Sequence, residues 1–141
     1  LENVLKTIPN GSLLNIEIKF LGPFDFSTVS KINNIIKKTK KDHNILISSF
    51  NPFIVFYARW FLTNIRTAFL VETLDMIKWM HFSHPDCLHP RYDLLSDDLI
   101  NECKKRKLSI NTWTVNSKNS IELCRTLDLD GIITDREDVC L

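Results

Sequence analysis

The stretch LLNIEIKF, residues 13–20, alternates apolar and polar side chains over most of its length. In an extended strand, the apolar members of such a stretch share one face and the polar members share the other. The polar face carries Asn15, Glu17 and Lys19. This pattern predicts a strand with helices over its apolar face. Its polar face then faces either solvent, as in an exposed strand at the edge of a sheet, or a ligand-lined interior.

Five more apolar runs follow, and they begin about 21–22 residues apart. That interval is typical of one strand followed by one crossover helix, so the chain predicts a repeated strand–helix unit. Together with the first run, the predicted strands span residues 13–20, 44–50, 65–71, 87–89, 109–115 and 131–134.

The segments between these runs carry helix signals. Asn51 precedes Pro52, which places an N-cap residue before a proline at the first helical position. Ser96 and Ser117 occupy equivalent N-cap positions, and residues 73–82 predict one short extra helix. Strands that alternate with helices predict a parallel sheet with right-handed crossovers. Periodicity alone leaves an open sheet and a closed barrel as alternatives.

The helix after Asn51 carries an aromatic stripe at three- and four-residue spacing. Such a stripe is more often core than a cofactor site, so we expect this face to be packed inside the protein. The stripe consists of Phe53, Phe56, Tyr57, Trp60 and Phe61.

Composition limits the function further. The 141 residues carry a formal net charge of +1 and 44% apolar residues, which fits one globular domain over residues 1–141. A charge near zero argues against nucleic-acid binding. The basic clusters at 37–41 and 104–107 fall near predicted helix ends, where cations complement the helix dipole. With three glycines, the chain has no glycine-rich nucleotide-binding loop.

The four cysteines are widely spaced and form no C-x-x-C pair, which favours reduced thiols in a cytoplasmic protein. No apolar run is long enough for a transmembrane segment. The opening residues LENVLK have the pattern of a helix interior, so we expect the sequence to be truncated at its N-terminus. The cysteines are Cys87, Cys103, Cys124 and Cys140.

Polar residues gather at the carboxyl end of the predicted strands. Because parallel strands end at the same edge of a sheet, these residues predict one rim, which is where α/β folds bind ligands. The rim residues are Ser48, Ser49 and Asn51 after the second strand, His89 after the fourth, Trp113 and Asn116 after the fifth, and Thr134 and Asp135 after the sixth.

The segments NIEIK, ISSFNP, RTAFL, LHP, NTWTVN and DGIITD resemble, in this order, successive strands of the glycerophosphodiester phosphodiesterase family. The most specific part is TWTVN followed about 15 residues later by DGIITD. The resemblance covers nearly the whole chain and implies a TIM (β/α)8 barrel, of which this chain would supply about strands three to eight.

The resemblance also implies an activity and site residues. The family hydrolyses glycerophosphodiesters to an alcohol and glycerol 3-phosphate, usually with a divalent metal ion such as Mg²⁺ or Ca²⁺. Glu17 matches a metal ligand, and a carboxylate suits such hard cations. Lys19 matches a lysine near the phosphate, where it would stabilise the transition state. Trp113 matches the tryptophan that packs against the glycerol end of the substrate.

The family's catalytic histidines, in a His-Arg-Gly segment and a His-Asp segment, have no match here. His43, His81 and His84 fit neither segment. We therefore expect the intact protein to be a phosphodiesterase and this chain alone to be inactive, with an N-terminal half missing. The first alternative is a non-catalytic barrel remnant that binds a phosphodiester or a protein partner. A weaker alternative is an unrelated open α/β binding domain.

Overall fold

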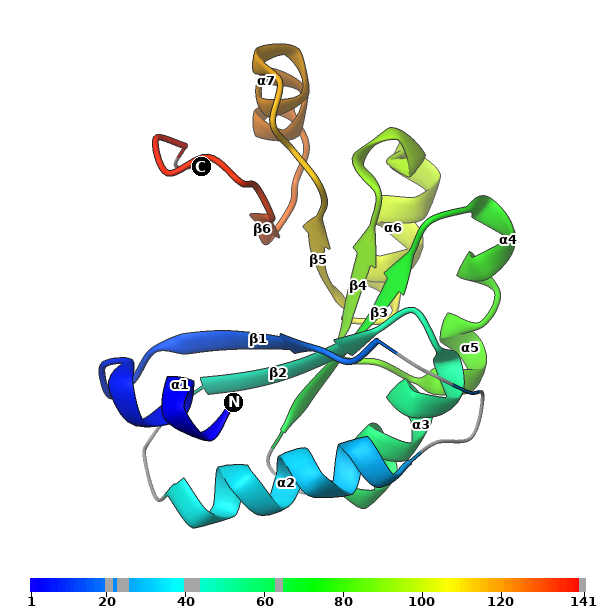
Figure 1. Cartoon of the computed structure of the whole chain (residues 1–141). Coiled ribbons are helices and arrows are strands. Elements are labelled where there is room, and N and C mark those ends of the chain that lie inside the picture. The colour runs from blue at the N-terminus through cyan, green and yellow to red at the C-terminus, as the bar shows by residue number, and fades with distance from the viewer. Residues whose placement is uncertain (20–21, 23–25, 40–43, 63–64, 140–141) are drawn as a thin grey trace.

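The computed structural model describes residues 1–19, 22, 26–39, 44–62 and 65–139. It contains a six-stranded parallel sheet in which the strands lie in the order of the chain, each beside the next (Figure 1). The strands are β1 (Leu13–Glu17), β2 (Asn44–Ser49), β3 (Arg66–Val71), β4 (Cys87–Pro90), β5 (Ser109–Thr112) and β6 (Gly131–Ile132).

The sheet curls, and its strands change direction progressively from β1 to β5 (Figure 1). Helices cover its convex side, and the sequential strand order has no reversal of the kind seen in doubly wound sheets. The fold is therefore a half-barrel, as in part of a TIM-like barrel. The helices are α1 (Glu2–Thr7), α2 (Ser27–Thr39), α3 (Pro52–Phe61), α4 (Leu74–Ile77), α5 (Met80–Ser83), the short 3-10 helix η1 (Tyr92–Leu94), α6 (Asp97–Lys105) and α7 (Lys118–Thr126).

All six predicted strands are present, although some end earlier than expected. Residue 20, the last position of the first predicted strand, lies outside the described residues. The predicted caps are confirmed: Asn51 Oδ1 accepts from Phe53 N at 2.9 Å, and Ser96 Oγ accepts from Leu99 N at 3.2 Å. Ser117 forms a capping box with Ser120. The single helix expected over residues 73–82 is instead two one-turn helices, α4 and α5.

The alternation along β1 is confirmed. Leu14 and Ile16 are partly buried against α1 and α2, and Ile18 is fully packed there. Asn15 and Glu17 on the other face are exposed. On β2, Ile45 and Ile47 belong to the same convex-side core, so the neighbouring residues of that strand face the concave side.

The prediction for the aromatic stripe of α3 was wrong for Trp60 and Phe61, whereas Tyr57 packs against the convex-side core as expected. The helix buries Ile54, Val55 and Ala58 against the sheet, whereas Trp60 is 61% exposed and Phe61 is 64% exposed. Both faces of α3 are apolar, and the smaller aliphatic side chains let the helix lie close to β2 and β3. The rings of Trp60 and Phe61 are therefore left on the outer surface.

Cys87, Cys103 and Cys124 are free and buried, as expected, and Cys140 lies outside the described residues. Burial raises the pKa of the Cys103 thiol to about 11, which keeps it protonated and unreactive at neutral pH. Among the described residues, no helix is both long enough and apolar enough to cross a bilayer.

Candidate functional site at the carboxyl rim

Glu17 and Lys19 lie two residues apart, at the end of β1 and just beyond it. Because side chains alternate along a strand, both extend from the concave, polar side, and both are exposed. Together with Ile18 and Phe50, they line a hollow of about 370 Å³. The rim of β1 and β2 therefore presents one carboxylate and one ammonium group around an open cavity.

Phe50 connects this hollow to Trp113. The two rings meet edge to face, with centroids 5.4 Å apart and planes at 89°. The Trp113 indole is held in place because its Nε1 donates to the His89 carbonyl oxygen at 2.6 Å. The structure thus brings Glu17, Lys19 and Trp113 to the same rim, with Phe50 between them.

Phe50 was absent from the residues predicted for the site. A signal for it was present in the sequence, because Leu46, Ser48 and Phe50 continue the two-residue period on the concave side. Its ring was overlooked because phenylalanine in an apolar run is ordinarily read as core.

Below the rim, His89 is 1% exposed, and its Nε2 lies 3.1 Å from Asn111 Nδ2. An amide nitrogen can only donate, so His89 Nε2 accepts and the proton of the neutral ring resides on Nδ1. Burial, followed by the charge of Arg66, lowers the pKa of His89 to about 4. His89 is therefore neutral at physiological pH.

Two buried polar atoms on this side of the sheet, Ser48 Oγ and His89 Nδ1, have no hydrogen-bond partner within the described part of the chain. Asn111 is also confined: a Cβ added to Gly131 would lie 2.7 Å from Asn111 Oδ1. A side chain at the start of the sixth strand would therefore push the Asn111 amide away from His89.

The turn that follows β6 is held by side chains. Thr134 Oγ1 donates to Asn116 Oδ1 at 3.0 Å and accepts from Arg136 N at 3.1 Å. Asn116 Nδ2 donates to an Asp135 carboxylate oxygen at 2.8 Å. Because these side chains hydrogen-bond to one another, they fix the shape of the rim.

The residues described at the rim do not by themselves make a metal centre. No group of three His, Cys, Asp or Glu side chains is placed to hold a cation anywhere in the described ranges. Glu17 offers one carboxylate, and a Ca²⁺ or Mg²⁺ ion needs several oxygen ligands. His81 and His84 are exposed on the outer side, at α5 and its C-cap, and His43 lies outside the described residues.

A larger hollow, of about 500 Å³, lies at the amino ends of the strands on the concave side. Arg66 Nη2 is 3.2 Å from both Cys87 Sγ and Ser109 Oγ there. The concave face thus has two separate openings, one at each end of the strands. The residues that the sequence predicts for the site are all at the carboxyl end.

A model of the glycerophosphoryl diester phosphodiesterase family matches residues 11–139 of the chain. The chain belongs to this family. A glycerophosphodiester phosphodiesterase from Caldanaerobacter subterraneus subsp. tengcongensis is 28% identical to it over 125 residues, which cover 87% of this chain and 51% of that protein.

Solved structures of glycerophosphodiester phosphodiesterases share the fold. A candidate glycerophosphoryl diester phosphodiesterase from Silicibacter pomeroyi DSS-3 has a TM-score of 0.84 at 18% identity, covering 98% of this chain and 53% of that one. An Oleispira antarctica phosphodiesterase in complex with the product sn-glycerol-3-phosphate has a TM-score of 0.74 at 19% identity, covering 86% and 51%. The chain spans about half the length of these relatives.

Proposed function

We propose that this chain forms the phosphate- and glycerol-facing side of a glycerophosphodiester phosphodiesterase, which hydrolyses glycerophosphodiesters to an alcohol and glycerol 3-phosphate. The observation that carries the proposal is the meeting of Glu17, Lys19 and Trp113 around Phe50, at the carboxyl rim of a chain that belongs to this family. The product bound to the Oleispira antarctica relative supports this substrate class.

Lys19 is proposed to bind the phosphate. Its ammonium group is exposed at the edge of the hollow and has no ion-pair partner among the described residues. A phosphodiester gains negative charge on its non-bridging oxygens as water attacks the phosphorus. A preorganised cation at that position stabilises the charge more in the transition state than in the ground state.

Trp113 and Phe50 are proposed to form the wall for the glycerol moiety. Their edge-to-face contact and the indole hydrogen bond to His89 fix the two rings against the sheet. A rigid aromatic surface contacts the CH groups of a polyol without competing for its hydroxyls. It would orient the phosphorus towards Lys19.

Glu17 is proposed to be one ligand of the divalent cation that this family uses. When bound, such an ion polarises the phosphoryl oxygens and acidifies a water molecule. The described residues supply only this carboxylate, so the other ligands would come from residues outside the described set. The general acid and base would also come from outside, because His89 is buried and neutral.

The proposal is tested first by binding. Calorimetry with sn-glycerol 3-phosphate should give a saturable heat for the 141-residue chain. The variant Lys19→Met should weaken affinity about tenfold or more, since a hydrogen bond to a charged group is lost. The control Lys31→Met removes an exposed lysine of α2 and should leave affinity unchanged. Equal affinities of the two variants would contradict the assignment.

Activity provides the second test. The full-length protein should release glycerol 3-phosphate from glycerophosphocholine, and Lys19→Met should reduce that rate by about 100-fold or more. Glu17→Gln should abolish the response of the rate to added Mg²⁺ or Ca²⁺, whereas Glu2→Gln on α1 should not. Binding without any hydrolysis by the full-length protein would instead support a non-catalytic phosphodiester-binding module.

A further inference from the structure

The outer surface of α3, α4 and α5 carries a continuous aromatic cluster, far from the concave site. It consists of Phe53, Phe56, Trp60, Trp79 and Phe82. Phe56 stacks on Phe82 with centroids 5.0 Å apart, Phe53 meets Phe82 at 5.2 Å, and Trp79 lies 6.1 Å from both Phe53 and Phe82. Trp60 extends the cluster at 6.3 Å from Phe56.

This outer aromatic cluster is not covered by the rest of the described chain. Trp60 is 61% exposed, Trp79 40% and Phe82 38%. Leu74 on α4 and Phe61 on α3 are 66% and 64% exposed. Single exposed apolar residues are ordinary, but a contiguous patch of large ones marks an interaction surface.

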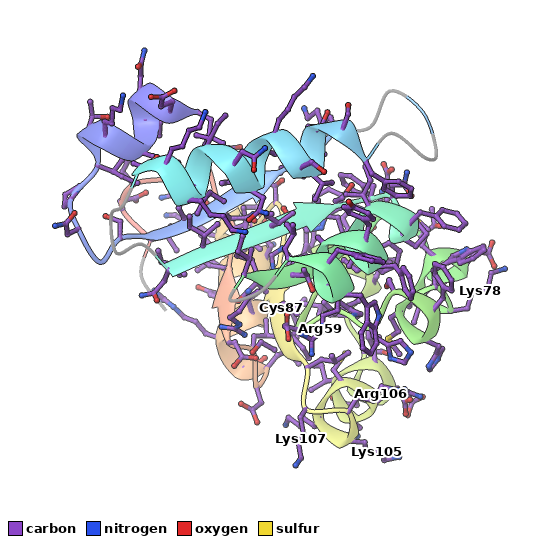
Figure 2. All side chains as sticks on the ribbon, turned by 90° about the horizontal axis from the view of Figure 1, so that it is seen from below. Arg59, Lys78, Cys87, Lys105, Arg106 and Lys107 are labelled. Atoms are coloured by element: carbon purple, nitrogen blue, oxygen red, sulfur yellow. The ribbon has the colours of Figure 1, made fainter. Side chains whose placement is uncertain are left out.

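Exposed cations also occur on this side of the molecule. Lys78 directly precedes Trp79, and Lys105 and Lys107 lie at the end of α6. Within the residues that the structure describes, none of these three ammonium groups takes part in an ion pair or hydrogen bond. Figure 2 shows them on the face seen from below, together with Arg59 and Arg106.

A shallow hollow lies on this face between α3, α5 and the end of α6. The ring of His84 lies 6.3 Å from Trp60, and His84, Arg59 and Arg106 line a space of about 350 Å³ floored by apolar side chains. Both guanidinium groups already have carboxylate partners: Arg59 lies 3.6 Å from Asp86, and Arg106 2.6 Å from Glu102. The cations of this face without an ion pair among the described residues are therefore the three lysines, and α4 also carries one exposed carboxylate, Asp75.

We propose that this face docks the protein on the surface of an anionic lipid bilayer, with the outer aromatic cluster at the headgroup boundary and the lysines on the headgroups. Tryptophan and phenylalanine on one side and lysines around them are the two signals that peripheral membrane binding combines. The site on the concave side faces away from α3 and α5, so docking leaves the carboxyl rim open. This proposal does not depend on the phosphodiesterase assignment.

Two other occupants fit the face less well. Single-stranded nucleic acid needs free ring faces for base stacking, whereas Phe56 and Phe82 stack on each other at an interplanar angle of 16°. A second copy related by two-fold symmetry would bring Lys78, Lys105 and Lys107 against the same face of its partner. The like charges would oppose that contact.

The test is co-sedimentation of the 141-residue chain with vesicles of phosphatidylcholine alone, and with vesicles that also contain phosphatidylserine. We expect binding to the second kind only, and release by salt. Each lysine near an anionic surface raises affinity about fivefold, so Lys78→Glu with Lys105→Glu should weaken binding by at least about 25-fold. The matched control is Lys37→Glu with Lys38→Glu on α2, and it should bind like the parent chain.

The aromatic contribution is tested separately. Trp60→Ala with Trp79→Ala should weaken vesicle binding about tenfold or more, because two large apolar side chains lose their place in the bilayer interface. Leu123→Ala on α7, where the side chain is 48% exposed, is the control for removal of an exposed apolar residue. Far-UV circular dichroism shows that each variant is folded before its binding is compared.

Tryptophan fluorescence reports directly whether the indole rings enter the bilayer. The chain has three tryptophans, so Trp113→Phe leaves only Trp60 and Trp79 as emitters. Brominated anionic lipids should quench them. Absence of quenching and of binding by the folded chain would overturn the proposal, as would binding that the lysine reversals leave unchanged. A solution dimer that Trp60→Ala with Trp79→Ala dissociates, or tighter binding to single-stranded RNA than to vesicles, would also overturn it.

Discussion

The central and edge strands of the half-barrel differ sharply in how they are covered. In β2 and β3, every residue after the first is buried, and all four residues of β4 are buried. In β1, exposed and partly buried residues alternate, and both residues of β6 are only partly buried. A strand between two others can hold Ser48 or His89 out of water, whereas β1 can hold Glu17 with its charge solvated.

The comparison explains where the candidate site lies. Charged groups need solvent or partners, so Glu17 and Lys19 belong on the strand whose concave face is open. The central strands place small or neutral residues at the corresponding positions, such as Ala68 beside Ser48. Four measurements test whether the central and edge strands differ in this way.

The largest difference is expected from truncating one apolar residue in each kind of strand. Phe69→Ala on β3 removes a fully buried ring and should lower the free energy of unfolding by about 3–5 kcal/mol. Leu13→Ala on β1, where the side chain is 77% exposed, should change it by less than about 0.5 kcal/mol. Urea unfolding followed by circular dichroism measures both. Similar losses in the free energy of unfolding would show that the two strands are equally buried.

The second measurement concerns the buried, neutral histidine of β4, His89. In the fold, His89 has a pKa of about 4, against an ordinary value of 6.5. Between pH 6.5 and 4, the unfolded chain therefore binds a proton that the folded chain excludes. The free energy of unfolding falls as the pH is lowered through this window, by up to about 3 kcal/mol.

The variant His89→Asn isolates this effect, because asparagine does not titrate. The stability difference between the parent chain and the variant should shrink as the pH falls from 6.5 towards 4. His81→Asn on the exposed side of α5 is the control for replacing a histidine by asparagine. A constant offset for His89→Asn would mean that the imidazole is reached by water.

The third measurement addresses the contact between β5 and β6. Gly131→Ala places a methyl group against Asn111 Oδ1 and should destabilise the fold by about 1–3 kcal/mol. Gly22→Ala has open space around it and serves as the control. Adding Asn111→Ala to Gly131→Ala should recover part of the loss in a double-mutant cycle. Additive losses would exclude a direct clash.

The smallest effects are expected at the helix caps. Asn51→Ala removes the cap of α3, which follows a central strand, and Ser117→Ala removes the cap of α7, which packs near the edge. Each should cost about 1 kcal/mol. Hydrogen exchange of the α7 amides distinguishes the two, because a separately opening edge would respond to Ser117→Ala and not to Asn51→Ala. Equal responses would indicate one cooperative unit.

Much of the fold followed from the sequence. The spacing of apolar runs predicts six strands with intervening helices, and the caps at Asn51, Ser96 and Ser117 mark where three helices begin. Periodicity could not provide the lateral order of the strands, because an apolar run does not identify its neighbour. The match to strands three to eight of a full barrel remains a prediction.

The orientation of α3 could not be read from its pattern. A helical period shows which residues share a face, but α3 is apolar on both faces, so the pattern does not say which one meets the sheet. The close approach to β2 and β3 selects Ile54, Val55 and Ala58. At the rim, the positions of Glu17 and Lys19 followed from alternation, whereas the contact between Phe50 and Trp113 depends on the curl of the sheet.

The sequential order of the strands has a consequence for how the chain folds. Among the described strands, each pairs only with its neighbours in the sequence, so no pairing in this sheet has to wait for a distant segment. Folding can begin at the well-covered unit of β3 and β4 and spread outwards one unit at a time, as in repeat proteins. The unit that carries Glu17 and Lys19 would then be among the last to form and the first to open.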